Sequence, residues 1–323
     1  MKIAIDISPL ESGHKVRGVG LYVKYLKQAL ERANTIHELD FVTDLGQAKN
    51  ADILHIPYFE PFVRHIPLIK KIQTVITIHD LTPIRFPSHF PVGMKGNAIW
   101  QVNKRLASSM DAIITDSESS SIDVVDIIKT SRDKVHTVHL APADEFRQAV
   151  GNKQQVAIRK KFKLPERFVL YVGDVTWNKN VPRIIEASIK ADVPIVIAGK
   201  AIANREYDRS HPWNSDLVKT QKLLDGYSKS IILGFIADDE LRALYKMATV
   251  LLFPSLYEGF GLPVVEAMAS SCPVITSQEG SLAEVGGKAV YYVDPYSVVS
   301  IADGITDVFE SKSLQNQLKK SGL

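Results

Sequence analysis

Short apolar runs alternate along the chain with longer segments whose apolar positions recur at helical spacing. In the first half the runs span residues 2–7, 53–56, 74–78, 112–115 and 135–138. The second half repeats the pattern at residues 168–172, 194–198, 231–234, 249–253, 273–276 and 289–293. Strand-type runs that alternate with helical segments are typical of parallel sheets covered by helices, so the pattern predicts an α/β fold.

The same pattern predicts two domains. A polar stretch at residues 142–165 carries no strand signal and separates the two sets of runs. We therefore expect one domain at 1–150 and another at 151–323, and a chain with 45% hydrophobic residues can bury two cores. Open α/β sheets bind ligands beyond the carboxyl ends of their strands, so a cleft between the two domains is the expected binding site.

Composition and charge exclude several classes of function. The net charge of +3 comes from 39 basic and 36 acidic residues mixed along the chain, which argues against a nucleic-acid partner. The single Cys272 has no partner for an intramolecular disulfide, so we expect a small buried thiol in a reducing compartment. No apolar run approaches the roughly 18 residues of a membrane span. An acid at Asp6 interrupts the apolar N-terminus that a signal peptide needs, and we expect a cytoplasmic protein.

The most informative segment covers residues 253–266, with the sequence FPSLYEGFGLPVVE. An apolar strand is followed by Gly259 and Gly261, which permit a tight turn, and then by Pro263, which suits the first turn of a helix. Glu258 lies before this turn, and Glu266 lies on the first turn of the helix. The segment therefore predicts a strand, a glycine turn and a helix with a carboxylate on either side of the turn.

Such a turn can bind phosphate and sugar oxygens. We expect the backbone N–H groups of Phe260, Gly261 and Leu262 at the helix N-terminus, where unpaired donors and the helix dipole attract anions. A carboxylate at Glu266 can accept both hydroxyls of a ribose. The simpler alternative is a solvated Glu258 and a Glu266 that only complements the dipole, worth under about 1 kcal/mol. The complete string favours the ligand site.

Two loops supply further candidates. Gly18 and Gly20 lie between the first strand and a helix expected at 22–32, where their N–H groups can approach a diphosphate. A simple turn is the stronger interpretation of an isolated Gly-x-Gly. Lys179 lies in a loop after Gly173, where it can neutralise phosphate as a point charge, with a solvated lysine as the alternative.

His79 follows the strand at 74–78 and can contact a sugar hydroxyl, although a structural histidine is a strong alternative. The string at 116–119, Asp-Ser-Glu-Ser, is expected to cap the helix after the strand at 112–115 rather than to bind substrate. The chain contains no Asp-x-Asp sequence, the commonest acidic pair that holds a nucleotide sugar through a divalent metal. Cations and backbone amides are expected to serve instead.

Taken together, these segments resemble the retaining GT-B glycosyltransferases of family 4 (glycosyl transferases group 1) over nearly the whole chain. The specific part is the pair Glu258 and Glu266, which matches the E-x7-E motif of that family at full spacing. The resemblance implies two Rossmann-like parallel-sheet domains that face each other across a cleft. The first is the acceptor-side domain and the second binds the nucleotide sugar. Family members usually end in a helix that crosses back onto the first domain, which a chain ending at Leu323 does not show.

The resemblance also implies residue roles, without a metal or a cofactor. Glu258 contacts the donor sugar, Glu266 takes the ribose and Lys179 binds phosphate, while His79 positions the sugars. The implied catalytic residues are His79, Glu258 and Lys179. The implied donor-binding residues are Gly18, Gly20, Lys179, Lys200, Gly234, Phe235, Ile236, Glu258, Gly259, Phe260, Gly261, Leu262 and Glu266. Many family members carry an arginine where this chain has Asp174, and Lys200 and Arg17 are the candidate replacements.

The implied activity is metal-independent transfer of a hexose, with retention, from a nucleoside diphosphate sugar to a glycan or lipid-linked saccharide. The neighbourhood of His79 favours GDP-mannose over a UDP-hexose. The alternatives are a nucleotide-sugar epimerase or hydrolase of the same fold, and a nonenzymatic nucleotide-sugar-binding protein. A peripheral contact with the inner face of the membrane is a further hypothesis, based on an amphipathic segment with Lys95, Trp100, Lys104 and Arg105, for which a solvated helix is the alternative.

Overall fold

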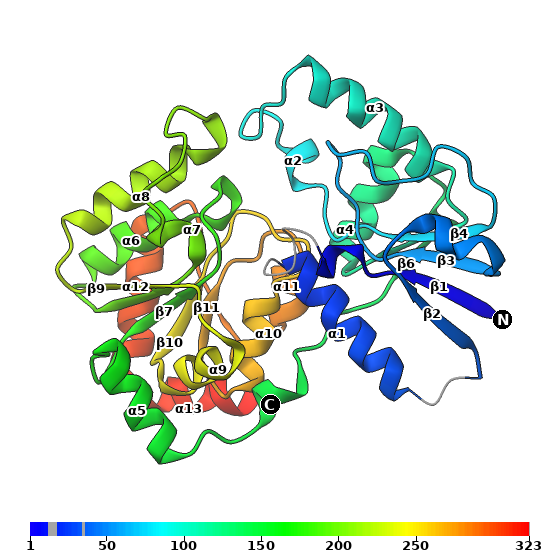
Figure 1. Ribbon diagram of the computed structural model, residues 1–323. Helices are drawn as coiled ribbons and strands as arrows, with labels where there is room; N and C mark the ends of the chain where they lie inside the picture. The colour runs from blue at the N-terminus through cyan, green and yellow to red at the C-terminus, as the bar shows by residue number, and fades with distance from the viewer. Residues whose placement is uncertain (12–17, 34–35, 323) are drawn as a thin grey trace. The chain divides into compact units, whose positions relative to one another are not determined.

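The computed structural model describes residues 1–11, 18–33 and 36–322. The chain divides into two compact units (Figure 1). Unit 1 comprises Met1–Pro87 and Val92–His139, and unit 2 comprises Ser88–Pro91 and Leu140–Leu323. The sequence predicted a boundary at 150/151, whereas this part of unit 2 begins at Leu140, so the whole polar stretch at 142–165 lies in unit 2.

Within the described residues, unit 1 contains a six-stranded parallel sheet in the order β2-β1-β3-β4-β5-β6. The strands are β1 (Lys2–Asp6), β2 (Glu38–Val42), β3 (Ile53–Ile56), β4 (Gln73–Thr77), β5 (Ala112–Thr115) and β6 (Val135–Thr137). The helices are α1 (Gly18–Arg32), α2 (Thr82–Arg85), α3 (Met94–Ser108) and α4 (Glu118–Asp123). One apolar core joins the sheet to α1, α2 and α3, with Ile76, Ile113 and Ala107 fully buried in it.

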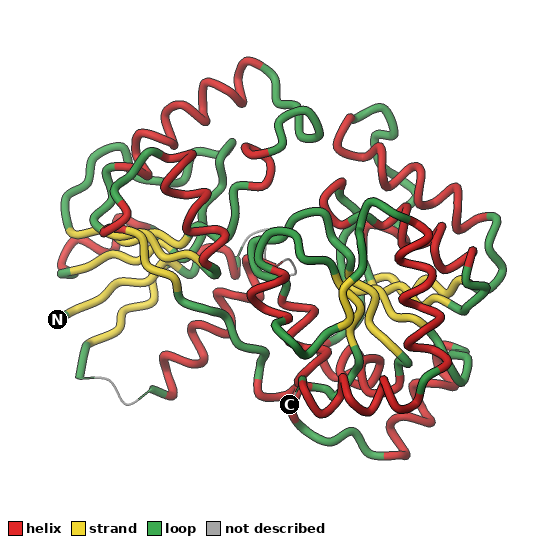
Figure 2. Tube along the Cα trace, turned by 180° about the vertical axis from the view of Figure 1, so that it is seen from behind, coloured by secondary structure: helices red, strands yellow, loops and turns green. Residues whose placement is uncertain are grey.

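Unit 2 also contains a six-stranded parallel sheet within the described residues, in the order β12-β11-β10-β7-β8-β9. Its strands are β7 (Val169–Val172), β8 (Ile195–Ala198), β9 (Ser230–Gly234), β10 (Val250–Phe253), β11 (Val274–Thr276) and β12 (Tyr291–Tyr292). Its helices are α5 (Asn152–Phe162), α6 (Val181–Lys190), α7 (Lys200–Ala203), α8 (Ser215–Asp225), α9 (Asp238–Met247), α10 (Leu262–Ala269), α11 (Leu282–Gly286), α12 (Val298–Glu310) and α13 (Lys312–Ser321). Helices lie on both faces of this sheet (Figure 2).

The predicted α/β class is confirmed, because every apolar run of the sequence overlaps a strand and all the strand pairs are parallel. Strands β8 and β10 are buried at every position, as continuous apolar runs predict for a sheet that is covered on both faces. The sequence missed β2, an edge strand whose acidic and partly exposed positions weaken its apolar pattern.

The strand order of unit 2 reverses at the centre of the sheet. Strands β7, β8 and β9 extend in one direction from the centre, and β10, β11 and β12 extend in the other, so the order reverses between β7 and β10. In open parallel sheets this reversal creates a crevice at the carboxyl ends of the two central strands, where ligands bind. The segments that follow β7 and β10 are therefore the first place to look for a site.

Candidate functional site

The segment after β10 forms the predicted glycine turn and helix. Gly261 caps the N-terminus of α10 with φ +99°, a conformation that glycine adopts without strain. A Cβ atom at this position would lie 2.8 Å from Cδ2 of Leu282, so the turn also needs glycine for space. Pro263 follows in the first turn of the helix, as expected. The sequence therefore predicted this strand, turn and helix correctly.

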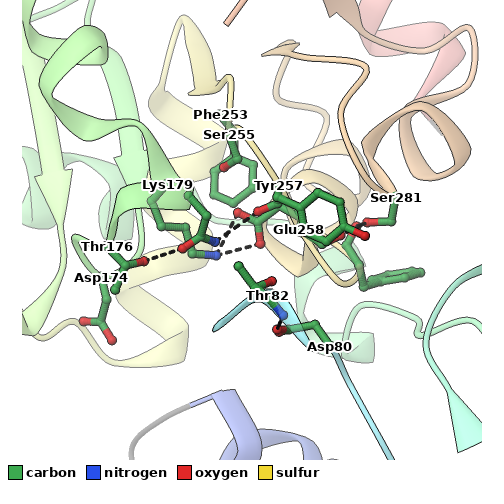
Figure 3. A network of polar contacts seen from close by, with 12 residues as sticks. Asp80, Thr82, Asp174, Thr176, Lys179, Phe253, Ser255, Tyr257, Glu258 and Ser281 are labelled. Carbon is green, nitrogen blue, oxygen red and sulfur yellow. Dashed lines mark hydrogen bonds and ion pairs between the residues drawn. The ribbon is translucent and has the colours of Figure 1, made fainter. Parts of the chain in front are cut away.

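An ion pair joins the segments that follow the two central strands. Lys179 Nζ lies 2.9 Å from Glu258 Oε1 and 2.7 Å from Oε2, so the ammonium contacts both carboxylate oxygens (Figure 3). The Glu258 side chain is only 7% exposed and that of Lys179 is 23% exposed. The ammonium also lies 5.3 Å from the centre of the Phe253 ring. Two residues that are far apart in the sequence and were predicted to act in one site are thus in direct contact.

Two buried asparagines hold this pair in position. The Asn178 side-chain amide donates to the backbone carbonyl of Tyr257 at 3.0 Å. The backbone carbonyl of Asn178 accepts from the N–H of Leu256 at 2.7 Å. Asn180 donates to the carbonyls of Pro254 and Pro295 and adopts φ +59°. Sequence reasoning missed both residues. The Asn-Lys-Asn string was a usable signal, because asparagine tolerates the left-handed conformation and bonds to neighbouring backbone.

Ser281 and Gly280, in the loop before α11, also contact the backbone of Glu258. The Ser281 N–H and hydroxyl lie 3.3 and 3.1 Å from the Glu258 carbonyl, and the hydroxyl lies 2.8 Å from the carbonyl of Phe260. A Cβ atom at Gly280 would lie 2.8 Å from the Glu258 carbonyl oxygen. Neither residue was predicted, because these contacts depend on a loop more than twenty residues along the chain.

Glu266 lies on α10, but as the fifth residue of the helix it follows the first turn on which the sequence placed it. It has a partner that the sequence did not reveal. The hydroxyl of Tyr245, on α9, donates to Glu266 Oε2 at 3.0 Å. Burial raises the pKa of Glu266 to about 7, and nearby Asp238 also raises it, whereas the hydrogen bond from Tyr245 lowers it. Near neutral pH this carboxyl therefore exchanges between a proton-bearing form and a carboxylate that accepts hydrogen bonds.

Glycines occupy the carboxyl ends of three neighbouring strands of unit 2. A Cβ atom at Gly199, after β8, would lie 2.2 Å from the carbonyl of Gly173, after β7. The Gly199 N–H donates to the carbonyl of Gly234, at the end of β9. Beyond Gly234, the Phe235 side chain is exposed and Ile236 is buried. Gly234 itself is buried, and the roles of Gly234, Phe235 and Ile236 toward a base stay predictions.

The candidates proposed to replace the missing arginine differ from Lys179 in their surroundings. Lys200 begins α7 and is exposed, and Asp174 is also exposed. In the described part of the chain, neither side chain forms a hydrogen bond or an ion pair with Lys179 or Glu258. Arg17 lies outside the described residues. A role for Lys200 at a phosphate stays a prediction.

Gly18 and Gly20 do not lie in a loop before a helix, which corrects the sequence interpretation. Helix α1 begins at Gly18 instead of at residue 22, so both glycines belong to its first turn, and Gly20 is buried. The sequence misled because two glycines in three residues favour a turn. Their N–H groups remain among the first four of a helix, which lack helical partners. Their proposed contact with a diphosphate stays a prediction.

His79 lies in unit 1, beyond the end of β4. Its Nδ1 is 2.7 Å from Asp116 Oδ2, and the Tyr22 ring packs edge-on at 4.5 Å. Burial lowers the pKa of His79, but the neighbouring Asp116 carboxylate outweighs burial and the net pKa is raised. Ser117, not Asp116, caps α4, because its side chain accepts from the Ser120 N–H. The expected cap is thus confirmed at Ser117, while Asp116 belongs to the surroundings of His79.

Several other predictions have structural outcomes. Cys272 is a buried free thiol, as expected, and burial raises its pKa to about 12. The proposed membrane-contacting segment lies on α3, but Trp100 is only 8% exposed because it packs against Phe59, so it is not an aromatic anchor. Among the described residues, no helix is long and apolar enough to cross a bilayer. No group of three His, Cys, Asp or Glu side chains forms a metal-ligand set in that same part of the chain.

The fold and this site define a known family. Residues 153–323 match the family described as Glycosyl transferases group 1, which is more than half of the chain. The chain therefore belongs to the group 1 glycosyltransferase family, as the E-x7-E string indicated. The match covers β7 to α13 and includes Lys179, Glu258 and Glu266.

Relatives of known name point in the same direction. The chain is 27% identical over 263 residues to the "Serotype-specific mannosyltransferase WbdA" of Escherichia coli, covering 78% of this chain and 31% of that protein. It is 26% identical over 263 residues to the "O-antigen chain mannosyltransferase B" of the same organism, covering 78% of this chain and 65% of that protein. The chain thus spans about a third of the first relative and about two thirds of the second.

Solved structures with the same fold cover the whole chain. Sucrose-phosphate synthase from Thermosynechococcus elongatus matches with a TM-score of 0.72 at 18% identity, covering 100% of this chain and 93% of that one. The Anabaena protein HepE, solved with UDP and glucose, matches with a TM-score of 0.70 at 17% identity and the same coverage. WaaG, a glycosyltransferase involved in lipopolysaccharide biosynthesis, matches with a TM-score of 0.69 at 12% identity, covering 100% and 94%. The two-unit architecture is therefore of the GT-B type.

Proposed function

We propose that the chain is a retaining, metal-independent hexosyltransferase. It moves a hexose, which we take to be mannose, from a nucleoside diphosphate sugar to a hydroxyl of a glycan or lipid-linked saccharide. The observation that carries the proposal is the contact of Lys179 with Glu258 at the strand-order reversal of unit 2, beside the N-terminus of α10. This arrangement brings a cation from the segment after β7 into contact with the carboxylate that precedes the N-terminus of α10.

The chemistry of donor binding follows from these groups. The ammonium of Lys179 has three N–H donors, and its charge attracts phosphate oxygens. The helix N-terminus at Gly261 and Leu262 adds backbone donors and a favourable dipole for the same anion. Glu258 and Glu266 are acceptors, which suit the hydroxyls of a hexose and a ribose. A nucleoside diphosphate sugar carries all three kinds of group in one molecule.

The proposed transfer reaction develops negative charge on the diphosphate, close to Lys179 and the N-terminus of α10. The bond between the anomeric carbon and the phosphate oxygen breaks, and a bond forms from that carbon to the acceptor oxygen. In the proposed one-face reaction the acceptor proton passes to the departing phosphate oxygen. Negative charge grows on the diphosphate as it departs, and Lys179 together with the N-terminus of α10 stabilises that charge. His79 positions a sugar hydroxyl and takes no proton in this scheme.

The identity of the donor is proposed from relatives. Two E. coli relatives are named mannosyltransferases, and a third relative is the "MMP alpha-(1->4)-mannosyltransferase" of Mycolicibacterium hassiacum, 28% identical over 193 residues. We therefore propose GDP-mannose as the donor and a saccharide as the acceptor, with the reaction at the cytoplasmic face of a membrane. Because HepE was solved with UDP and glucose, UDP-glucose is the alternative donor to compare with GDP-mannose.

The experiment is a donor panel followed by product analysis. Thermal shift with GDP- and UDP-sugars identifies the donor, and NMR of the product from a saccharide acceptor panel gives the anomeric configuration. We expect GDP-mannose to stabilise the chain most and the product to keep the α configuration of the donor, with and without EDTA. Inversion or loss of transfer with EDTA would refute the mechanism. Turnover without an acceptor would indicate an epimerase or hydrolase, and tight binding without turnover a binding protein.

A further inference from the structure

Tyr245 makes a contact with Glu266 that the proposed reaction does not yet use. Tyr245 lies on α9, is fully buried, and packs edge-on to Phe146 at a centroid distance of 5.9 Å. Its hydroxyl reaches Glu266 Oε2 at 3.0 Å. In the described part of the chain this is the only side chain that bonds to the Glu266 carboxyl, so Oε1 accepts no hydrogen bond there. A fixed aromatic ring thus restrains one carboxylate oxygen and leaves the other available.

We propose that Tyr245 is a positioning residue that holds Glu266 so that Oε1 is presented to the ribose hydroxyls of a nucleoside diphosphate. This inference rests on the proposed function, because it deepens the role of Glu266 at the same site. It refines the sequence interpretation, in which the Glu266 carboxylate accepts both hydroxyls of a ribose, by naming the oxygen that accepts them. With Oε2 occupied by the tyrosine hydroxyl, one oxygen is left to accept from the 2′ and 3′ hydroxyls.

The contact also controls the charge of Glu266. Burial and the neighbouring Asp238 raise the pKa of Glu266 to about 7, and the tyrosine hydroxyl opposes them by stabilising the carboxylate. The elements packed against α10 carry other charged groups, including Arg242 and Lys246 on α9, Arg147 before α5 and Glu284 on α11. None of these forms an ion pair with Glu266 among the described residues. Tyr245 therefore favours the ionised form of this carboxyl against the effects of burial and Asp238.

Removal of the hydroxyl is the direct test. Tyr245→Phe keeps the ring and its packing but removes the donor, so the pKa of Glu266 should rise above its wild-type value of about 7. NMR of the side-chain carboxyl carbons, in protein with 13C-labelled glutamate, measures that pKa. The Glu266 signal is assigned as the one that is missing in Glu266→Gln. Tyr227→Phe is the control, because that hydroxyl donates to the Val193 carbonyl in the same unit. It should leave the Glu266 pKa unchanged.

Binding provides the second readout. Calorimetric titration with GDP and UDP from pH 6 to 9 should show an affinity that rises with pH as Glu266 ionises. In Tyr245→Phe the midpoint should move to higher pH. We expect a loss of about three- to tenfold at pH 7, the size of one ordinary hydrogen bond, and a smaller loss at pH 9. A tyrosine that only supports folding would lower the affinity equally at every pH.

The two readouts separate the possible failures. An unchanged Glu266 pKa in Tyr245→Phe overturns the positioning role whatever the binding data show. A raised pKa in Tyr245→Phe, with wild-type chain that binds no nucleoside diphosphate, refutes the proposed function and with it the ribose contact. A raised pKa with affinity that is unchanged at every pH also overturns the inference, because it shows that the nucleotide does not depend on the carboxylate. A raised pKa with a shifted binding midpoint supports it.

Discussion

At the scale of single residues, the ion pair of Lys179 and Glu258 is both a candidate ligand site and a buried electrostatic contact. The Glu258 side chain is almost fully shielded from solvent, and the ammonium of Lys179 contacts its carboxylate. Removal of one partner from a buried pair leaves an uncompensated charge, whereas removal of both does not. A substitution at Lys179 or Glu258 is therefore expected to change both ligand binding and the free energy of unfolding, and the variants must be chosen to measure the two effects separately.

The first prediction concerns this coupling. Lys179→Ala should destabilise unit 2 by about 3–5 kcal/mol, because Glu258 is left buried without its cation. The double variant Lys179→Ala with Glu258→Gln should be closer to wild type, since no charge remains. Urea unfolding measures both. Equal destabilisation by the single and the double variant would show that the pair contributes packing rather than charge.

The second prediction concerns Glu266 and pH. Its folded pKa of about 7 exceeds the model-compound value of 4.5, so the folded state binds the proton more tightly than the unfolded chain does. Its contribution to stability is therefore most favourable below pH 4.5 and declines as the pH rises through 7. Glu266→Gln should become more stable relative to wild type across this window. The exposed Glu310→Gln is the control, and a pH-independent difference for Glu266→Gln would contradict the assignment.

The third prediction concerns His79. The raised pKa depends on the Asp116 carboxylate, and burial alone acts in the opposite direction. Asp116→Asn should therefore lower the His79 pKa to below the ordinary value of 6.5, measured by NMR of the ring protons. In wild type the pair stabilises unit 1 below pH 6.5, and this contribution is lost as the pH rises through the folded pKa. Asp123→Asn, which removes a buried acid paired with Arg85, should leave the titration of His79 unchanged.

At the scale of secondary structure, the strand-turn-helix unit at β10 and α10 was predictable because its signals are local. The apolar run, the glycines and Pro263 each favour the same local structure, and no distant residue has to be known. The contacts that aim its carboxylates were not predictable. Asn178, Ser281 and Tyr245 reach the unit from other loops and helices, and single-sequence periodicity contains no information about such pairs. The start of α1 was mispredicted because a helix that begins with two glycines contradicts intrinsic propensity.

The fourth prediction tests the glycine turn. Gly261→Ala should destabilise the chain by about 1–3 kcal/mol, because alanine is strained at φ +99° and its Cβ would meet Leu282. Gly151→Ala is the matched control, since Gly151 also precedes a helix but has φ −67° and open space around its Cβ position. We expect a change within about 0.5 kcal/mol for the control. Equal effects of the two substitutions in chemical denaturation would show that the turn tolerates a side chain.

At the scale of the whole molecule, the fold class and the family followed from the sequence. The whole-chain structural matches confirm the fold, and the match over residues 153–323 confirms the family. The particular donor and acceptor did not follow. They depend on a few side chains at the strand ends of each unit, and relatives with the same fold differ in the sugars that their names give. The E-x7-E string indicated the family, and the match over residues 153–323 confirms it.

The central claim is that Lys179 and the N-terminus of α10 hold a diphosphate, and calorimetric titration of the intact chain with GDP and UDP tests it most directly. We expect binding by wild type and a loss of about ten- to a hundredfold in Lys179→Ala, as for a charge-assisted contact. The double variant with Glu258→Gln should show the same loss while remaining folded. Lys219→Ala, which removes a lysine paired with Glu186 in the same unit, should bind like wild type. Unchanged affinity in the folded double variant would contradict the account.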